Sequence, residues 1–260
     1  MGCRRARGAP VEVGLTSILL IIGTGVIAGF FNVTAGGGST LTLPLLMILL
    51  GLPGPVANGT NRIAIIIQNA VAAPTFRHGG VRGLRYTLPL IVAALPGAAL
   101  GAWWGSTISD LLFRRLLALI MIGLAALIVL TPRPEPLPRH AVPTGYRPVT
   151  YLTFLGVGLY AGFVQAGVGF LMIFALAGLE AFPLVRVHAF KVTIVLALQV
   201  AVLPIFLAHS TVIWSVGLYL AAGLSLGGYI GARTALKGSE RLLRVLLAIA
   251  AVAMAIKLLL

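Results

Sequence analysis

Charged residues are the scarcest class in this sequence. Asp, Glu, Lys and Arg together make up 9% of the 260 residues, whereas apolar residues make up 59%. A soluble domain carries about a quarter charged residues, so this chain could not cover its own surface with polar groups. The deficit excludes an ordinary soluble fold. It predicts an all-α polytopic protein whose surface is covered by the lipid bilayer.

Acids are rarer still, and all of them fall at the ends of apolar stretches or in connections. The chain has five against 19 Lys and Arg, for a net charge of +14; the acids are Glu12, Asp110, Glu135, Glu180 and Glu240. This placement excludes a buried chain of acids for proton pumping and argues against a cation substrate. Nucleic acid is not the expected partner either, because the basic residues lie mainly in short connections, as in the cytoplasmic loops of membrane proteins.

Cysteine is nearly absent, and histidine is not clustered. Cys3 is the only thiol, which excludes an intrachain disulfide and a cysteine-rich metal site. The four histidines show no metal-ligand spacing, and no nucleotide-binding motif is present. We therefore expect no metal, no cofactor and no enzymatic activity, with movement of any substrate driven by gradients.

Long apolar runs are abundant. Eight of them approach the 20 or so residues that cross a bilayer, at 11–33, 56–76, 84–104, 111–130, 149–164, 185–207, 211–236 and 242–260. Two shorter runs, 40–50 and 170–179, each follow a glycine cluster and are too short to cross untilted. The residues alone leave open whether these two runs span the membrane or re-enter it.

The chain is internally repeated with an offset of 130 residues. Pro53 matches Pro183 and Pro74 matches Pro204 at this offset, and each half opens with a glycine-interrupted apolar run. We predict a first transmembrane repeat at 1–130, an aqueous linker rich in Pro and Arg at 131–148, and a second repeat at 149–260. Matched repeats with broken helices are typical of secondary transporters.

Two orientations of the repeats are open. Basic residues gather in 77–85, in the linker and in 237–244. Five segments per repeat, with the N-terminus outside, place all three basic regions in the cytoplasm and invert the second repeat. Four crossings per repeat make the repeats parallel and put two basic regions on opposite sides. Charge counting favours inversion, although Arg4, Arg5 and Arg7 then lie outside.

Polar residues deep in the apolar runs are the candidate substrate ligands. They occupy corresponding places in the two halves and share helix faces through spacings of three and four residues. Our candidates are Asn32, Gly36, Gly37, Gly38, Ser39, Thr60, Asn61 and Arg62 in the first half, with Gln165, Gly167, Gly169, His188, Lys191 and Gln199 in the second.

Each kind of candidate has a structural alternative. Charged groups inside a membrane are costly and face a cavity or a partner, but Arg62 and Lys191 could instead extend to the membrane interface. The glycine clusters could let backbone amides face an anion at a half-helix start, or could serve close helix packing. His188 could sense protonation or be a packed, satisfied histidine.

The motifs around the first glycine cluster resemble a known family. Residues 35–44 read Ala-Gly-Gly-Gly-Ser-Thr-Leu-Thr-Leu-Pro, followed by Gly-Leu-Pro at 51–53 and Ala-Asn-Gly-Thr-Asn at 57–61. This pattern resembles the sulfite exporter family, also called TauE/SafE. The resemblance implies a multi-pass permease of the cytoplasmic membrane for small sulfur-containing anions. The second half departs from it, since Ala189, Phe190 and Lys191 replace Gly59, Thr60 and Asn61, which predicts an asymmetric site.

The sequence thus predicts a secondary transporter for a small oxyanion such as sulfite or an organosulfonate. Amides at the half-helix starts would donate hydrogen bonds, together with Thr60, Asn61 and Gln165, and Lys191 would offset the substrate charge. An anion channel is the nearest alternative, and a membrane-embedded enzyme is a more distant one. The expected partners are the bilayer and the substrate anion, and a homodimer is left open.

Overall fold

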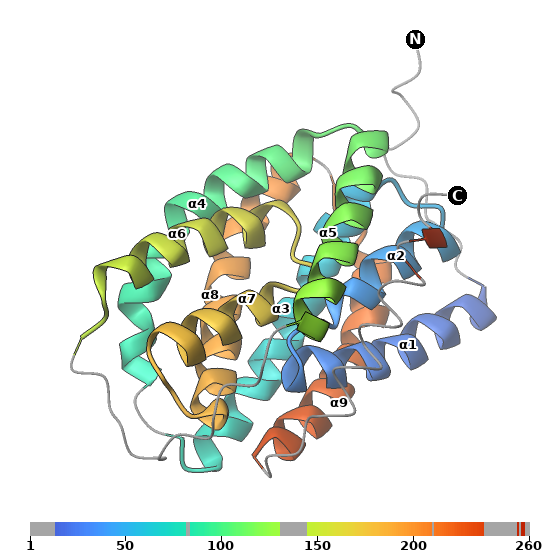
Figure 1. The fold of residues 1–260 in the computed structure, drawn as a ribbon. Coiled ribbons are helices and arrows are strands. Elements are labelled where there is room, and N and C mark those ends of the chain that lie inside the picture. The colour runs from blue at the N-terminus through green and yellow to red at the C-terminus, as the bar shows by residue number, and fades with distance from the viewer. Residues whose placement is uncertain are drawn as a thin grey trace.

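The computed structural model describes residues 14–81, 84–130, 145–209, 211–236, 254, 256 and 257, and this part of the chain is helical without strands (Figure 1). The all-helical prediction is therefore confirmed. The elements are α1 (Leu15–Thr34), α2 (Ser39–Leu49), α3 (Gly54–His78), the 3₁₀ turn η1 (Leu84–Tyr86), α4 (Thr87–Thr107), α5 (Asp110–Leu130), α6 (Pro148–Phe163), α7 (Val168–Ile173), the π-helix η2 (Phe174–Leu179), α8 (Leu184–Ala208) and α9 (Trp214–Ala235).

The helices agree with the apolar runs to within a few residues. α6 begins at Pro148, the last residue of the expected linker, and a proline is well suited to this first helical position. Residues 131–144 of that linker lie outside the described residues, as does nearly all of the expected last run at 242–260.

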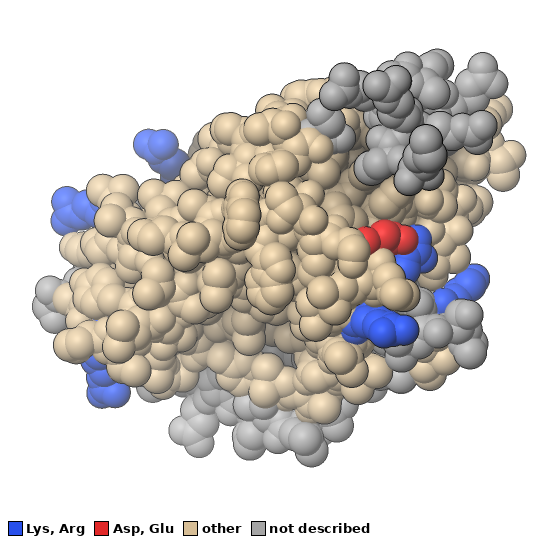
Figure 2. All heavy atoms as spheres, turned by 90° about the horizontal axis from the view of Figure 1, so that it is seen from above, with Lys and Arg blue, Asp and Glu red and all other residues tan. Residues whose placement is uncertain are grey.

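Among the described residues, four helices are long and apolar enough to cross a membrane, namely α1, α4, α8 and α9. Their outer faces carry bare aliphatic side chains, and Leu88 on α4 is 62% exposed. Figure 2 shows Lys and Arg side chains towards opposite edges of one face, with an uncharged surface between them. An apolar band between charged rims fits a bilayer and would be unfavourable in water.

Two helix pairs form the most extensive contacts, α1 with α9 and α4 with α6, and both pairs lie side by side in Figure 1. Glycines bring each pair together: a Cβ on Gly101 of α4 would lie 2.0 Å from the carbonyl oxygen of Leu159, and a Cβ on Gly227 of α9 would lie 1.9 Å from that of Val26. These two glycines therefore serve close helix packing, because only glycine permits such an approach.

Contacts between helix ends fix the directions of the helices. α3 and α9 end together, where Gly79 faces the side chain of Leu236. α4 and α8 also end together, where the Ser106 hydroxyl lies 3.2 Å from Nδ1 of His209. α8 is antiparallel to α3, because Arg62 near the start of α3 contacts Phe206 near the end of α8. The ends of α3 and α9 therefore lie at one end of the molecule, which we call the Gly79 end, and the ends of α4 and α8 lie at the other, which we call the Asp110 end.

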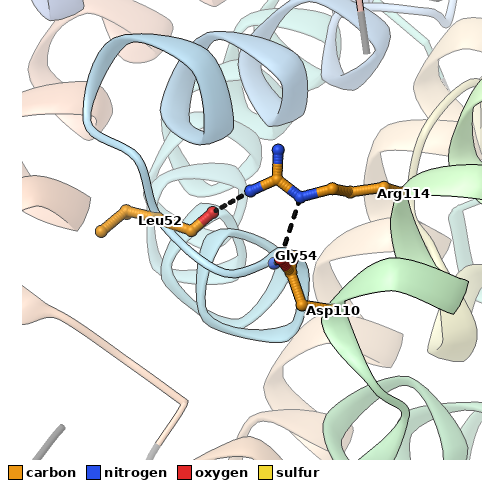
Figure 3. A network of polar contacts seen from close by, with 4 residues as sticks. All are labelled: Leu52, Gly54, Asp110 and Arg114. Carbon is orange, nitrogen blue, oxygen red and sulfur yellow. Dashed lines mark hydrogen bonds and ion pairs between the residues drawn. The ribbon is translucent and has the colours of Figure 1, made fainter. Parts of the chain in front are cut away.

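The Asp110 end is joined by a small polar network that holds the start of α3 against the start of α5 (Figure 3). One oxygen of Asp110 accepts a hydrogen bond from the Gly54 amide at 2.6 Å, and the other pairs with Nε of Arg114 at 3.0 Å. Arg114 also reaches the carbonyl of Leu52 at 3.5 Å. A carboxylate here satisfies a first-turn amide and complements the positive end of the α3 dipole.

The short helices turn back alongside the helices that precede them. At Gly38 a Cβ would lie 2.1 Å from the carbonyl oxygen of Ala28, so the chain has already reversed when α2 begins. In the second half, η2 ends at Glu180, whose carboxylate accepts a hydrogen bond from the Arg147 amide at the start of α6. The runs 40–50 and 170–179 are thus the shorter arms of two hairpins, α1–α2 and α6–α7–η2.

We predict that cysteines placed at Gly80 and Arg233 face the same side of a membrane, and that a cysteine at His209 faces the other. The reason is that α3 and α9 end together while α8 ends at the opposite end of the molecule. A Cys3→Ser background leaves no other thiol. Labelling with a membrane-impermeant maleimide from one side at a time checks this, and labelling of positions 80 and 233 from opposite sides would contradict the fold.

Candidate functional site

The two glycine breaks meet in the interior. Gly36 follows α1 with a φ of 86°, a left-handed conformation that favours glycine. A Cβ on Gly36 would lie 2.6 Å from the backbone of Gly169, and a Cβ on Gly169 would lie 2.4 Å from Cα of Gly36. The two breaks, 133 residues apart in sequence, therefore touch through bare backbone, and the ends of α1 and α6 both lie beside this contact.

Lys191 binds the end of α1. Its Nζ donates hydrogen bonds to the carbonyls of Asn32 at 2.9 Å and Val33 at 2.7 Å, and it lies 3.4 Å from Nδ1 of His188. These carbonyls belong to the last turn of α1, where the helix itself supplies no amide partners. The ammonium group also complements the negative end of the α1 dipole.

Arg62 binds the end of α6 in the same way. Its guanidinium donates to the carbonyls of Ala161 and Gly162, in the last turn of α6, and to the side-chain oxygen of Gln199. The ring of Phe206 lies 4.0 Å from the guanidinium carbon and adds a cation–π contact.

These positions decide between the two interpretations of the cations. Arg62 is 0% and Lys191 is 3% exposed, and their head groups bind backbone in the interior. Neither side chain extends to the membrane interface. Each cation lies on a helix of one half and binds the broken helix of the other half, a reciprocal arrangement that we call the helix-end bonds.

Buried amide side chains surround the breaks, and some of their polar atoms have no partner within the described part of the chain. Asn61 accepts a hydrogen bond from the Thr42 hydroxyl at 2.8 Å, which ties α3 to α2, while its Nδ2 has no partner there. Gln165, 1% exposed beside the second break, has neither its oxygen nor its nitrogen satisfied. Unsatisfied buried groups are costly, so these atoms are candidates for binding a ligand.

The remaining sequence candidates fall into two groups. Ser39, His188 and Gln199 are buried, whereas Asn32 is half-buried near the end of α1 and donates to the side-chain oxygen of Gln68 at 2.8 Å. Thr60 instead faces α9, where its hydroxyl accepts a hydrogen bond from the Ile213 amide at 3.0 Å. The structure thus gives Thr60 a helix-joining contact away from the breaks.

Gly37, Gly38 and Gly167 complete the breaks. The carbonyl of Gly37 accepts bonds from both the amide and the hydroxyl of Thr40, and the carbonyl of Gly38 accepts from the Leu41 amide. Gly167, with a φ of 70°, precedes α7. The backbone amides of Gly37, Gly38 and Ser39, which precede Thr40 in the turn, can face a ligand at the start of α2.

Three contributors were not among the sequence candidates. Asn58 donates to the Phe163 carbonyl at 2.7 Å, Gln68 donates to the Gly29 carbonyl at 2.9 Å, and Phe206 covers Arg62. Asn58 and Gln68 could have been found from their polarity within an apolar run. Phe206 could not, because an apolar ring in a membrane helix is unremarkable on sequence alone.

The chemistry of this region favours anions. It combines two buried cations with unpaired amide groups, while the two acids of the described chain, Asp110 and Glu180, bind backbone at helix starts. Within the same part of the chain, no three His, Cys, Asp or Glu side chains gather as a metal ion would need. The arrangement can hold an oxyanion and offers no evident set of metal ligands.

Comparison with known proteins gives one family and several relatives. The family described as sulfite exporter TauE/SafE matches residues 21–258. A probable membrane transporter protein, ORF9, of Sinorhizobium sp is 28% identical over 90% of this chain and 88% of its own length. Probable membrane transporter proteins of Haemophilus influenzae and Escherichia coli (YfcA) are 25% and 26% identical, over 91% and 86% of their lengths. No solved structure matches the chain.

We predict that Gly36→Ala destabilises the protein more than Gly51→Ala. Both glycines have positive φ, so both substitutions introduce backbone strain, but a Cβ on Gly51 meets nothing within 4 Å. The clash with Gly169 should add about 1–3 kcal/mol, as overpacking does in other cores. Thermal unfolding of the purified variants measures the difference. Equal losses of stability would mean that the two breaks do not touch.

Proposed function

Because the chain belongs to the sulfite exporter TauE/SafE family, we propose that it is a secondary transporter that moves a small sulfur-containing oxyanion, such as sulfite or an organosulfonate, across the cytoplasmic membrane. The relatives are named as probable membrane transporters. The observation that carries the proposal is the meeting of two broken helices beside two buried cations and unpaired amides.

The substrate would lie at the glycine breaks. Nδ2 of Asn61 and the amide of Gln165 would donate hydrogen bonds to the oxyanion, together with the backbone amides ahead of Thr40 at the start of α2. The bare backbones of the breaks, from Gly36 to Gly38 and at Gly167 and Gly169, would allow close approach. Helix starts favour anions because their amides point outward and carry the positive end of the dipole.

The buried cations would supply the charge that attracts the anion. Lys191 would offset the substrate charge from the side of α1, and Arg62 would do the same from the side of α6. His188 beside Lys191 and Gln199 beside Arg62 would orient the two cations. A cation held inside an apolar body acts through a low dielectric, so its attraction for an anion is much greater than it would be in water.

The repeats would be inverted, with 1–130 and 149–260 as the two units and 131–148 between them. Equivalent helices run in opposite directions: α3 and α8, each 25 residues long and offset by 130, are antiparallel. This arrangement has five segments per repeat, with the short arm of each hairpin counted as a segment. Arg77, Arg85 and Arg147 then share the Gly79 end, which we assign to the cytoplasm by the positive-inside rule.

A transporter and an anion channel share this chemistry, and flux separates them. In proteoliposomes, sulfite flux through a transporter saturates as the sulfite concentration rises, and the transporter exchanges labelled for unlabelled sulfite across the membrane. Flux through a channel stays close to linear in sulfite concentration. Absence of flux for sulfite, organosulfonates and other small oxyanions alike, in protein that remains folded, would remove the proposed function.

We predict that Asn61→Leu weakens sulfite binding and that Asn69→Leu does not. Loss of one hydrogen bond to a charged ligand costs about 1.5–3 kcal/mol, which corresponds to roughly a 10- to 150-fold rise in Kd. Asn69 is the matched control, because it is also buried on α3 but donates to the Ile65 carbonyl of its own helix. Calorimetry in detergent measures both. A parallel loss in the two variants would assign Asn61 to helix packing.

We predict that Lys191→Met weakens anion binding and that Lys191→Arg retains part of it. The methionine keeps a similar volume but removes the charge, whereas the arginine keeps the charge in a different geometry. The expected loss for Lys191→Met is about 1.5–3 kcal/mol. Affinity for sulfite and methanesulfonate is the measurement, with thermal unfolding as the check on folding. Unchanged affinity in folded Lys191→Met would leave the amides and Arg62 as the anion ligands.

A further inference from the structure

We infer that the helix-end bonds of Lys191 and Arg62 are exchangeable, so that the carbonyl ends of α1 and α6 occupy the two cations in the empty protein and an oxyanion displaces them during transport. This inference rests on the proposed function for the identity of the displacing ligand. The bonds themselves are present in the structure, and their existence can be tested without any substrate.

The physical argument starts from the cost of a buried cation. An ammonium or guanidinium group inside an apolar body is stable only with partners. Lys191 obtains two carbonyls and Arg62 obtains two carbonyls and an amide oxygen. The end of a helix carries about half a negative charge, so each broken helix acts as a partial substitute for an anion. An oxyanion carries at least a full charge and is the stronger partner.

Because each cation binds a helix of the other half, displacement of that helix end by an anion would free a hairpin of the other half. Lys191 lies on α8 but holds α1, and Arg62 lies on α3 but holds α6. Displacement at Lys191 therefore frees the hairpin α1–α2, and displacement at Arg62 frees the hairpin α6–α7–η2. Each hairpin bears one of the glycine breaks, so binding of the anion would loosen the elements that enclose it.

The two cations also have contacts other than the helix ends. Arg62 is further held by Gln199 and by the ring of Phe206. Lys191 is held by two carbonyls and approached by His188 at 3.4 Å. Each cation thus has a side-chain neighbour on α8 beside its backbone acceptors.

Hydrogen exchange on the full chain in detergent tests the bonds in the empty protein. Lys191→Met should speed exchange of the backbone amides in 31–40 by roughly tenfold or more and leave 160–170 as in wild type. Arg62→Met should do the reverse. Arg115→Met, at an exposed cation, is the matched control and should change neither segment. Acceleration confined to the helix that carries the substitution, or equal in both segments, would overturn the inference.

Charge-retaining variants keep the test decisive if a methionine variant does not fold. Lys191→Arg should leave exchange in 31–40 close to that of wild type. Arg62→Lys should accelerate exchange in 160–170 only, since the lysine ammonium lacks the planar fork of the guanidinium and loses some of its bonds. If Arg62→Lys accelerates 31–40 instead, the cross-half assignment is wrong.

Addition of sulfite to the wild-type protein tests the displacement. Exchange in 31–40 should rise at concentrations that saturate binding by calorimetry, and in Lys191→Met sulfite should add nothing to the already accelerated segment. Bound sulfite with unchanged exchange in both segments would overturn the displacement while leaving the proposed function intact. Failure of every tested oxyanion to bind would instead contradict the proposed function. The reciprocal effects of Lys191→Met and Arg62→Met on hydrogen exchange, measured without substrate, would still decide whether the helix-end bonds exist.

Discussion

A helix that ends inside an apolar body leaves its last carbonyls without amide partners, and this constraint accounts for much of the structure. Within a bilayer there is no water to donate hydrogen bonds to such carbonyls. α1 and α6 both end this way, at Thr34 and Phe163. The chain satisfies their last turns with the longest polar donors it has in the interior, Lys191 and Arg62, each reaching across from the other half. The unpaired carbonyls of each helix end and the buried cation thus satisfy one another by hydrogen bonding.

Close packing of the halves makes this cancellation geometrically feasible. Glycines at Gly101 and Gly227 let α4 contact α6 and α9 contact α1 at backbone distance. These two pairs carry the broken helices, so their tight contact fixes where α1 and α6 end. Gly36 and Gly169 then meet between the two ends. A side chain at any of these four places would move a helix end away from its cation, so the glycines support the polar interior as well as the packing.

The sequence predicts the helices well and the partners of its cations poorly. Helix positions follow from apolar length, and the glycine breaks follow from composition, so both agree with the structure to within a few residues. The contacts of Lys191 could not be inferred, because its acceptors are the backbone carbonyls of Asn32 and Val33, and every residue has a carbonyl. If only carboxylates are considered as partners of a buried cation, such backbone acceptors are overlooked. Thr60, a candidate because it is a polar residue within an apolar run, instead binds the amide of Ile213 at the start of α9.

The scarcity of acids takes on a physical meaning in this light. A carboxylate beside Lys191 or Arg62 would carry a full charge and hold the cation as firmly as a substrate anion could, so binding would have little to gain. A helix end offers only a partial charge, spread over a few carbonyls. It stabilises the cation in the empty protein but remains the weaker partner. For an interior that must bind and release an oxyanion, backbone carbonyls are therefore better partners than side-chain carboxylates, and a chain with five acids against 19 basic residues is consistent with that requirement.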